Sequence, residues 1–173
     1  NSMKNKMIKN TKGKLNKAYD EWMNRYRFWE MDKLLESKKK LKLLDIGCGQ
    51  GTFLDIAEEK GYGALGGDEG NFSHEKIKKI SFEKFEINEK YDVISLYHLI
   101  EHVKNPRKVL KKVKNMLVDN GLVVIETPLI GNLSEKLSGE KYFVYFDKTH
   151  INLMSKKELV TLIHKSGFKI IRK

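Results

Sequence analysis

The chain has 173 residues, of which 40% are hydrophobic and 33% are charged, and its formal net charge is +11 at pH 7. This length predicts one domain with its own core, and the absence of an apolar run near the roughly 20 residues of a membrane-spanning helix predicts a soluble protein. Cys48 is the single cysteine, which excludes an internal disulfide and a multi-cysteine metal site.

The N-terminal residues 1–13 are predicted to form a disordered basic arm, and residues 14–173 a single domain. Six lysines and no acid lie within the first 17 residues. Because this stretch lacks the apolar segment of a signal peptide, we expect a cytoplasmic protein without a membrane partner. The positive charge makes a nucleic-acid partner possible, but only four of the 34 basic residues are arginine, the side chain best suited to phosphates and base edges, so that partner is not favoured.

Residues 14–37 predict an N-terminal helix. Its apolar residues recur at close to helical spacing and include four aromatics, Tyr19, Trp22, Tyr26 and Trp29. Such a stripe favours packing against the domain, with a lid over a bound ligand as the alternative.

The sequence LKLLDIGCGQGTF, residues 41–53, predicts a buried strand, a glycine loop and the start of a helix. Gly47, Gly49 and Gly51 leave the backbone bare, so a ligand can lie against it. The amides at the start of the helix favour a carboxylate or a phosphate. A dinucleotide site requires G-x-G-x-x-G, whereas the third glycine here comes one residue early, which disfavours a nicotinamide cofactor.

A second short strand, residues 63–67, is predicted to end at Asp68, which Glu69 follows. Asp68 comes about twenty residues after the glycine loop, where nucleotide-binding α/β sheets place a carboxylate that accepts hydrogen bonds from ribose hydroxyls. The loop and this acid together favour a nucleoside site more strongly than either does alone. A surface acid in a turn is the alternative for Asp68.

The second half of the chain continues the alternation of strands and helices. Strands are predicted at residues 80–85, 91–96 and 122–126, helices at residues 106–119 and 155–166, and the start of a sixth strand at residues 168–171. Residues 129–154 predict a long insertion rich in aromatics, and loops of this length usually carry function. The alternation predicts an α/β fold with a mostly parallel sheet and helices on both faces.

Three blocks resemble the class I S-adenosylmethionine-dependent methyltransferases and occur in the order that this family requires. They are LLDIGCGQGTF, GGDE and YDVISLYHLIEHVKNPRKVLKKVKNMLVDNGLVVIETP. The last block, with the tail YFVYFDKTHINLMSKKELVTLIHKSGF, resembles the ubiquinone-biosynthesis-type and related small-molecule enzymes. The resemblance implies a Rossmann-like fold, with the seventh strand absent or truncated here. It also implies S-adenosylmethionine as cofactor, S-adenosylhomocysteine as product and a small-molecule acceptor.

The resemblance also implies which residues bind the cofactor. In the family, the acid before the loop and the glycines surround the methionine part of the cofactor, and an acid beyond the third strand stands near the adenine. The implied cofactor-binding residues of this chain are Asp45, Gly47, Cys48, Gly49, Gly51, Asp68, Glu69, Glu86, Ile87, Tyr97 and His98.

Methyl transfer from a sulfonium is an in-line displacement, and a hydroxyl acceptor needs a base that takes its proton. Histidine is suited to this near neutral pH, so the catalytic candidates are His98, His102 and His150. The carboxyl ends of the strands, where ligands bind in open α/β sheets, favour the first two. The substrate pocket is predicted to include Tyr142, Tyr145, Asp147 and His150.

His98, Glu101 and His102 also fall on one side of a helical turn. Some ubiquinone-type relatives carry E-x-x-E-H at this position and bind a divalent cation through it. Here the first acid is replaced by His98, and packing at the start of a helix is the favoured alternative, so we predict no metal.

The favoured function is S-adenosylmethionine-dependent methylation of a small molecule at oxygen. The alternatives are a nucleic-acid or protein methyltransferase and a cofactor-binding protein without catalysis. The sequence leaves the acceptor and the oligomeric state open.

Overall fold

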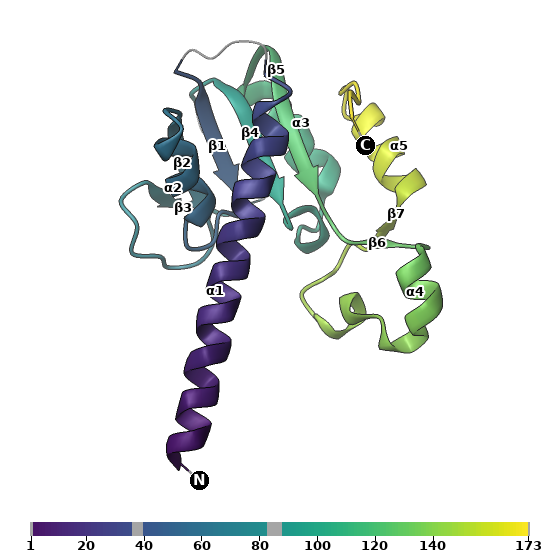
Figure 1. Ribbon diagram of the computed structural model, residues 1–173. Helices are drawn as coiled ribbons and strands as arrows, with labels where there is room; N and C mark the ends of the chain where they lie inside the picture. The colour runs from purple at the N-terminus through teal and green to yellow at the C-terminus, as the bar shows by residue number, and fades with distance from the viewer. Residues whose placement is uncertain (1, 36–39, 83–87, 173) are drawn as a thin grey trace.

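The computed structural model describes residues 2–35, 40–82 and 88–172. Its centre is a five-stranded sheet in the order β3-β2-β1-β4-β5, in which all neighbouring strands run parallel (Figure 1). The strands are β1 (Lys42–Ile46), β2 (Gly63–Asp68), β3 (Ile77–Lys79), β4 (Tyr91–Tyr97) and β5 (Leu117–Glu126). The predicted α/β fold with a mostly parallel sheet is therefore confirmed.

Helices cover both faces of this sheet. The α-helices are α1 (Ser2–Asp32), α2 (Thr52–Glu59), α3 (Pro106–Met116), α4 (Leu133–Ser138) and α5 (Lys156–Lys165). Short 3-10 helices are η1 (Ile100–His102), η2 (Gly139–Lys141) and η3 (Phe143–Phe146). No described helix is both long and apolar enough to cross a membrane.

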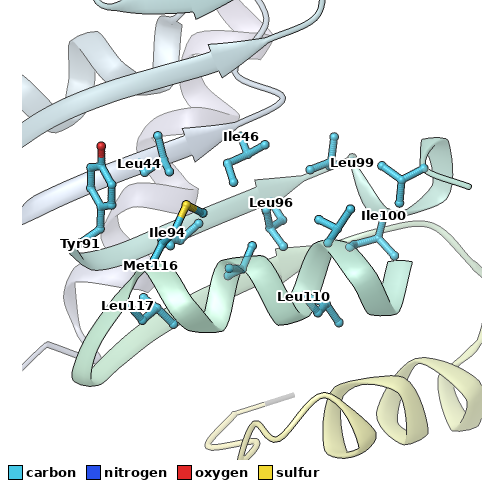
Figure 2. Close-up of a cluster of buried hydrophobic side chains, with 13 residues drawn as sticks. Leu44, Ile46, Tyr91, Ile94, Leu96, Leu99, Ile100, Leu110, Met116 and Leu117 are labelled. Carbon is cyan, nitrogen blue, oxygen red and sulfur yellow. The ribbon is translucent and has the colours of Figure 1, made fainter. Parts of the chain in front are cut away.

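Two apolar cores hold the helices on the sheet because successive strand residues point to opposite faces. Leu43 and Val93 pack with side chains of α1 and α2. Leu44 and Ile94 belong to the other core, which includes Val109 and further residues of α3 (Figure 2). The central strands are thus buried on both faces, which explains their nearly continuous apolar sequence.

Within residues 129–154, the structure adds elements that the sequence did not predict. Besides α4, η2 and η3, these residues form β6 (Leu129–Ile130), which pairs in parallel with β7 (Met154–Ser155) in a separate two-stranded sheet. Such short strands leave no periodic signal, so only the three-dimensional pairing shows them. Helix α5, which follows, begins with a capping box, in which the Ser155 and Glu158 side chains each accept a hydrogen bond from the other residue's backbone amide.

Two predicted strands differ in the structure. The third strand lies at Ile77–Lys79, and residues 80–82, the part of the predicted strand at residues 80–85 that the structure describes, form no strand. Ile80 packs its side chain against the core. Residues 168–171 form no strand. The Phe168 amide donates to the Ile163 carbonyl at the end of α5, 3.2 Å away. The segment therefore begins by capping this helix and does not pair with a strand of the sheet. A cleft of about 1240 Å³ lies between this segment, β5 and the end of α1.

Helix α1 also departs from the prediction. It begins at Ser2, within the stretch for which an arm without regular structure was expected, and runs without interruption to Asp32. The aromatics predicted to pack against the domain, Tyr19, Trp22, Tyr26 and Trp29, are exposed instead. The domain boundary at residue 14 stays a prediction.

Candidate functional site

The glycine loop between β1 and α2 has the bare backbone that its sequence predicts. Gly47, Gly49 and Gly51 all have positive φ angles, of 83°, 53° and 89°, a conformation that favours glycine. The Gly47 amide donates to the Gly67 carbonyl at 2.7 Å, which ties the loop to the end of β2. A Cβ atom built on Gly49 would meet nothing within 4 Å, so the crest of the loop is open.

Asp68 lies at the end of β2 and faces this crest, as predicted. Its Oδ2 accepts a hydrogen bond from the Gly49 amide at 2.9 Å, and its Oδ1 accepts one from the Gly70 amide at 2.8 Å. A carboxylate has about four acceptor positions, so Asp68 keeps capacity for a ligand hydroxyl. Neighbouring Glu69 instead accepts from the Phe82 amide at 3.0 Å.

Asp45 and Tyr97 are buried next to the loop, on adjacent strands β1 and β4. The Ser95 hydroxyl donates to Asp45 Oδ1 at 2.7 Å, and burial raises the pKa of Asp45 to about 7. The Tyr97 hydroxyl is buried and, within the described residues, has no hydrogen-bond partner. A buried carboxyl and an unpaired buried hydroxyl are costly unless a ligand compensates them, which marks this place as a candidate site.

Of three further predicted cofactor contacts, the structure describes only Cys48. Cys48 is half-buried in the loop, and burial raises the pKa of its thiol to about 12, so it is not a thiolate nucleophile near neutral pH. Glu86 and Ile87 lie outside the described residues.

His98 is held between two carboxylates at the end of β4. Its Nδ1 lies 3.3 Å from Glu101 Oε1, and its Nε2 lies 3.0 Å from Glu126 Oε1. Hydrogen bonds to Glu101 and then Glu126 raise the pKa of His98 to about 9. The imidazole is therefore protonated near neutral pH, and its two nitrogens are both engaged, which is unsuited to a general base.

Glu126, the last residue of β5, is the centre of a network that sequence reasoning missed. Burial opposes its ionisation, but hydrogen bonds from His98 and Arg27 lower its pKa to about 2. Arg27 Nε donates to Glu126 Oε2 at 3.1 Å, and the same guanidinium lies 4.8 Å from the centre of the Tyr97 ring. Arg27 thereby fastens α1 to the strand ends. A charged residue closing a predicted strand was the available signal for Glu126; for Arg27 the sequence held none.

His102 and His150 lie together beyond the strand ends, with ring centres 4.9 Å apart. His150 Nδ1 is 2.9 Å from the Val144 carbonyl, and His102 Nδ1 is 3.2 Å from the Thr149 carbonyl. A carbonyl only accepts hydrogen bonds, so both Nδ1 atoms carry the proton and both Nε2 atoms keep a lone pair. Of the three predicted catalytic histidines, these two have a nitrogen free to take a proton.

Glu101, His102 and His150 could hold a divalent metal ion, since one potential ligand atom from each lies within 4.8 Å of the others. Two imidazoles and a carboxylate suit a transition metal. This set differs from the triplet that the sequence brought together, because His150 takes the place of His98. The Glu101 carboxylate already accepts from Thr127 Oγ1 at 2.7 Å, as well as contacting His98.

The residues predicted to form the substrate pocket separate into two groups. Asp147 Oδ2 lies 3.6 Å from His150 Nε2, so this pair stays at the histidine cluster. Tyr142 is 5% exposed, and its hydroxyl donates to the Leu129 carbonyl at 3.1 Å, which is a contact inside the insertion. Tyr145 bonds Glu135 and is 45% exposed. These two tyrosines support the insertion, and their contact with a substrate stays a prediction.

Comparisons with known proteins agree with this geometry. Residues 19–173 match a family described as "Methyltransferase domain". The chain is 31% identical over 105 residues to the ubiquinone biosynthesis O-methyltransferase of Glaesserella parasuis serovar 5, covering 50% of this chain and 44% of the relative. It is 26% identical over 102 residues to the enzyme of the same name from Acinetobacter baumannii strain AYE, and this match covers 50% of this chain and 43% of the relative. The chain spans less than half the length of these relatives.

Solved structures share the fold. A SAM-dependent methyltransferase from Archaeoglobus fulgidus superposes with a TM-score of 0.70 at 22% identity, covering 86% of this chain and 69% of the other. The plantazolicin methyltransferase BpumL, in complex with SAH, gives a TM-score of 0.67 at 20% identity, covering 86% and 64%. At these identities the likeness shows the fold alone.

Proposed function

Because the chain belongs to the class I S-adenosylmethionine-dependent methyltransferase family, we propose that it transfers a methyl group from S-adenosylmethionine to an oxygen of a small molecule. The observation that carries this proposal is the pair of acids beside the glycine loop. Asp68 contacts the open crest at Gly49, and Asp45 is buried on the adjacent strand. The ubiquinone-type relatives support a small molecule and transfer to oxygen.

The residues present fit this cofactor, which supplies a methyl group on a positively charged sulfur. The Asp68 carboxylate next to a bare loop favours a nucleoside ligand that carries positive charge. Asp68 has acceptor positions left for ribose hydroxyls, and the loop crest leaves room for the ligand. Asp45 and the unpaired Tyr97 hydroxyl would bind the polar methionine end.

The histidine cluster supplies the proton acceptor that an oxygen acceptor group requires. His150 Nε2 has a free lone pair, and the imidazolium that forms when it takes a proton would be stabilised by Asp147, 3.6 Å away. His98 holds Glu101 and Glu126 in place and carries its proton throughout.

Calorimetric titration of the protein with S-adenosylmethionine, S-adenosylhomocysteine and NAD in parallel tests the cofactor assignment. We expect heat of binding from the first two compounds and none from NAD, because the spacing of the three glycines disfavours a dinucleotide. Binding of NAD without binding of S-adenosylmethionine would contradict the proposal.

Replacing Asp68 by alanine should weaken S-adenosylmethionine binding by about 1 to 3 kcal/mol, or about 5-fold to 150-fold in Kd, since a hydrogen bond to the ligand is lost. Asp68→Asn keeps an oxygen for the Gly49 amide and should bind with intermediate affinity. Asp119→Ala, which removes an exposed acid of β5, is the matched control and should leave Kd unchanged. Equal affinities in all three variants and the wild type would remove Asp68 from the site.

A further inference from the structure

Helix α1 carries an aromatic seam, which consists of Leu15, Tyr19, Trp22, Tyr26 and Trp29. Each of these side chains is between 48% and 64% exposed. The four rings form a continuous row, with neighbouring ring centres 6.0 to 6.2 Å apart. A continuous exposed apolar surface of this size is typical of an interaction site.

The aromatic seam lies on the side of α1 opposite its buried residues, and Tyr26 stands at the cleft between α1, β5 and the C-terminal segment. On the domain side, Phe28 and Met31 are buried in the core that α1 shares with α2. Figure 1 shows that the N-terminal part of α1 projects far beyond the sheet. The seam side chains are accessible to another molecule, since each is about half exposed.

The spacing of the seam indicates a helix as its partner. Its residues follow one another at intervals of 4, 3, 4 and 3, which is the repeat of the buried positions of a coiled coil. A helix that lies on a membrane surface usually presents a wider apolar face, whereas a stripe limited to these positions is the narrow seam between two helices.

The charges of α1 make it complementary to a second copy of itself. Six lysines and no acid occur in the first 17 residues, and all four acids of the helix lie within residues 20–32. Two parallel copies would place lysines next to lysines. Two antiparallel copies place the lysine-rich half of each helix beside the half of the other that contains the acids.

The exposed area of the seam is also large enough for a specific interface between two copies. Four aromatic side chains of about 200 Å² each, half exposed, together with Leu15, offer about 500 Å² per copy. Two copies would bury about 1000 Å², the lower bound for a specific interface, before flanking residues are counted. We propose that two copies of this chain form a dimer in solution through antiparallel packing of their α1 aromatic seams.

Sedimentation velocity over about 5 to 200 µM protein tests this dimer. We expect a concentration-dependent shift from monomer to dimer. Trp22→Glu and Leu15→Glu each place a charge in the seam and should raise the dimer Kd by at least about 100-fold. Leu137→Glu is the matched control, because Leu137 is 79% exposed on α4, outside the seam, and this variant should dimerise like the wild type.

The salt dependence decides the orientation. Antiparallel copies should dissociate more readily as salt rises from about 0.05 to 0.5 M, because their attraction is screened, whereas parallel copies would associate more tightly. Three outcomes would each overturn the proposal. The protein could be a monomer at all concentrations, the dimer could persist in both glutamate variants, or the protein could be a monomer that binds vesicles of anionic lipid. Circular dichroism of the variants verifies the fold. S-adenosylmethionine affinity is expected to stay the same in all of them, so this result is independent of the proposed function.

Discussion

Replacing His150 by glutamine should lower kcat by about 100-fold to 10,000-fold, the range that a positioned general base contributes, and leave S-adenosylmethionine affinity within about twofold. The expectation rests on the orientation of the ring. Its Nδ1–H donates to the Val144 carbonyl at 2.9 Å, so Nε2 carries the lone pair that takes the proton. The side chain is 12% exposed, and its surroundings hold the ring in this orientation.

Asp147 refines this prediction. Its Oδ1 accepts from the Thr149 amide at 2.9 Å, which fixes the carboxylate with Oδ2 toward His150 Nε2. Asp147→Asn keeps the shape of the group and removes its charge, so the imidazolium formed during transfer is less stabilised. We expect a smaller loss of kcat, about 10-fold.

The matched control is His164→Gln on the exposed end of α5, which should leave kcat unchanged. The measurement uses a panel of small molecules that carry hydroxyl groups, with radiolabelled S-adenosylmethionine, and calorimetry for the affinity. A His150→Gln enzyme with wild-type kcat would remove His150 as the base. Loss of wild-type activity in EDTA, restored by a divalent ion, would assign His150 a ligand role beside Glu101 and His102 instead.

The cofactor side of the molecule was predictable because its signals are local. A buried strand, three glycines and an amphipathic helix follow one another without a gap, and each implies the next. Asp68 was predictable as well, since the end of a neighbouring parallel strand meets the same edge of the sheet as the loop. The structure places its carboxylate on the Gly49 amide.

The acceptor side could not be predicted in the same way. His102 and His150 are 48 positions apart, and the two-residue strands β6 and β7, which pair on either side of the segment that contains His150, have no periodic pattern. Sequence spacing therefore grouped His98 with His102. In the structure, His98 instead contacts the carboxylates of Glu101 and Glu126, and His102 lies beside His150. The prediction that the α1 aromatics pack against the domain was wrong for a related reason. An apolar stripe at helical spacing predicts a contact but does not say with which molecule.

Replacing Glu101 by alanine should lower the free energy of unfolding by about 2 to 4 kcal/mol, the usual cost of a cavity combined with a lost buried hydrogen bond. The Glu101 side chain is fully buried and accepts from Thr127 Oγ1 at 2.7 Å while it contacts His98. Glu101→Gln fills the same space and should cost less. Glu140→Ala, at an exposed acid, is the control and should be neutral within about 0.5 kcal/mol by urea unfolding.

The pH dependence of stability separates the charge of Glu101 from its volume. Hydrogen bonds from His98, among others, outweigh burial and lower the Glu101 pKa below 4.5, so its stabilising effect is present above pH 4.5 and is lost as the pH falls through the folded pKa. The pKa of His98 is raised from 6.5 to about 9, so its stabilising effect is present below pH 6.5 and is lost as the pH rises to about 9. Glu101→Gln removes one of the two carboxylates that raise the His98 pKa and should therefore flatten the decline between pH 6.5 and 9. An unchanged alkaline decline in this variant would show that Glu126 alone sets the His98 pKa.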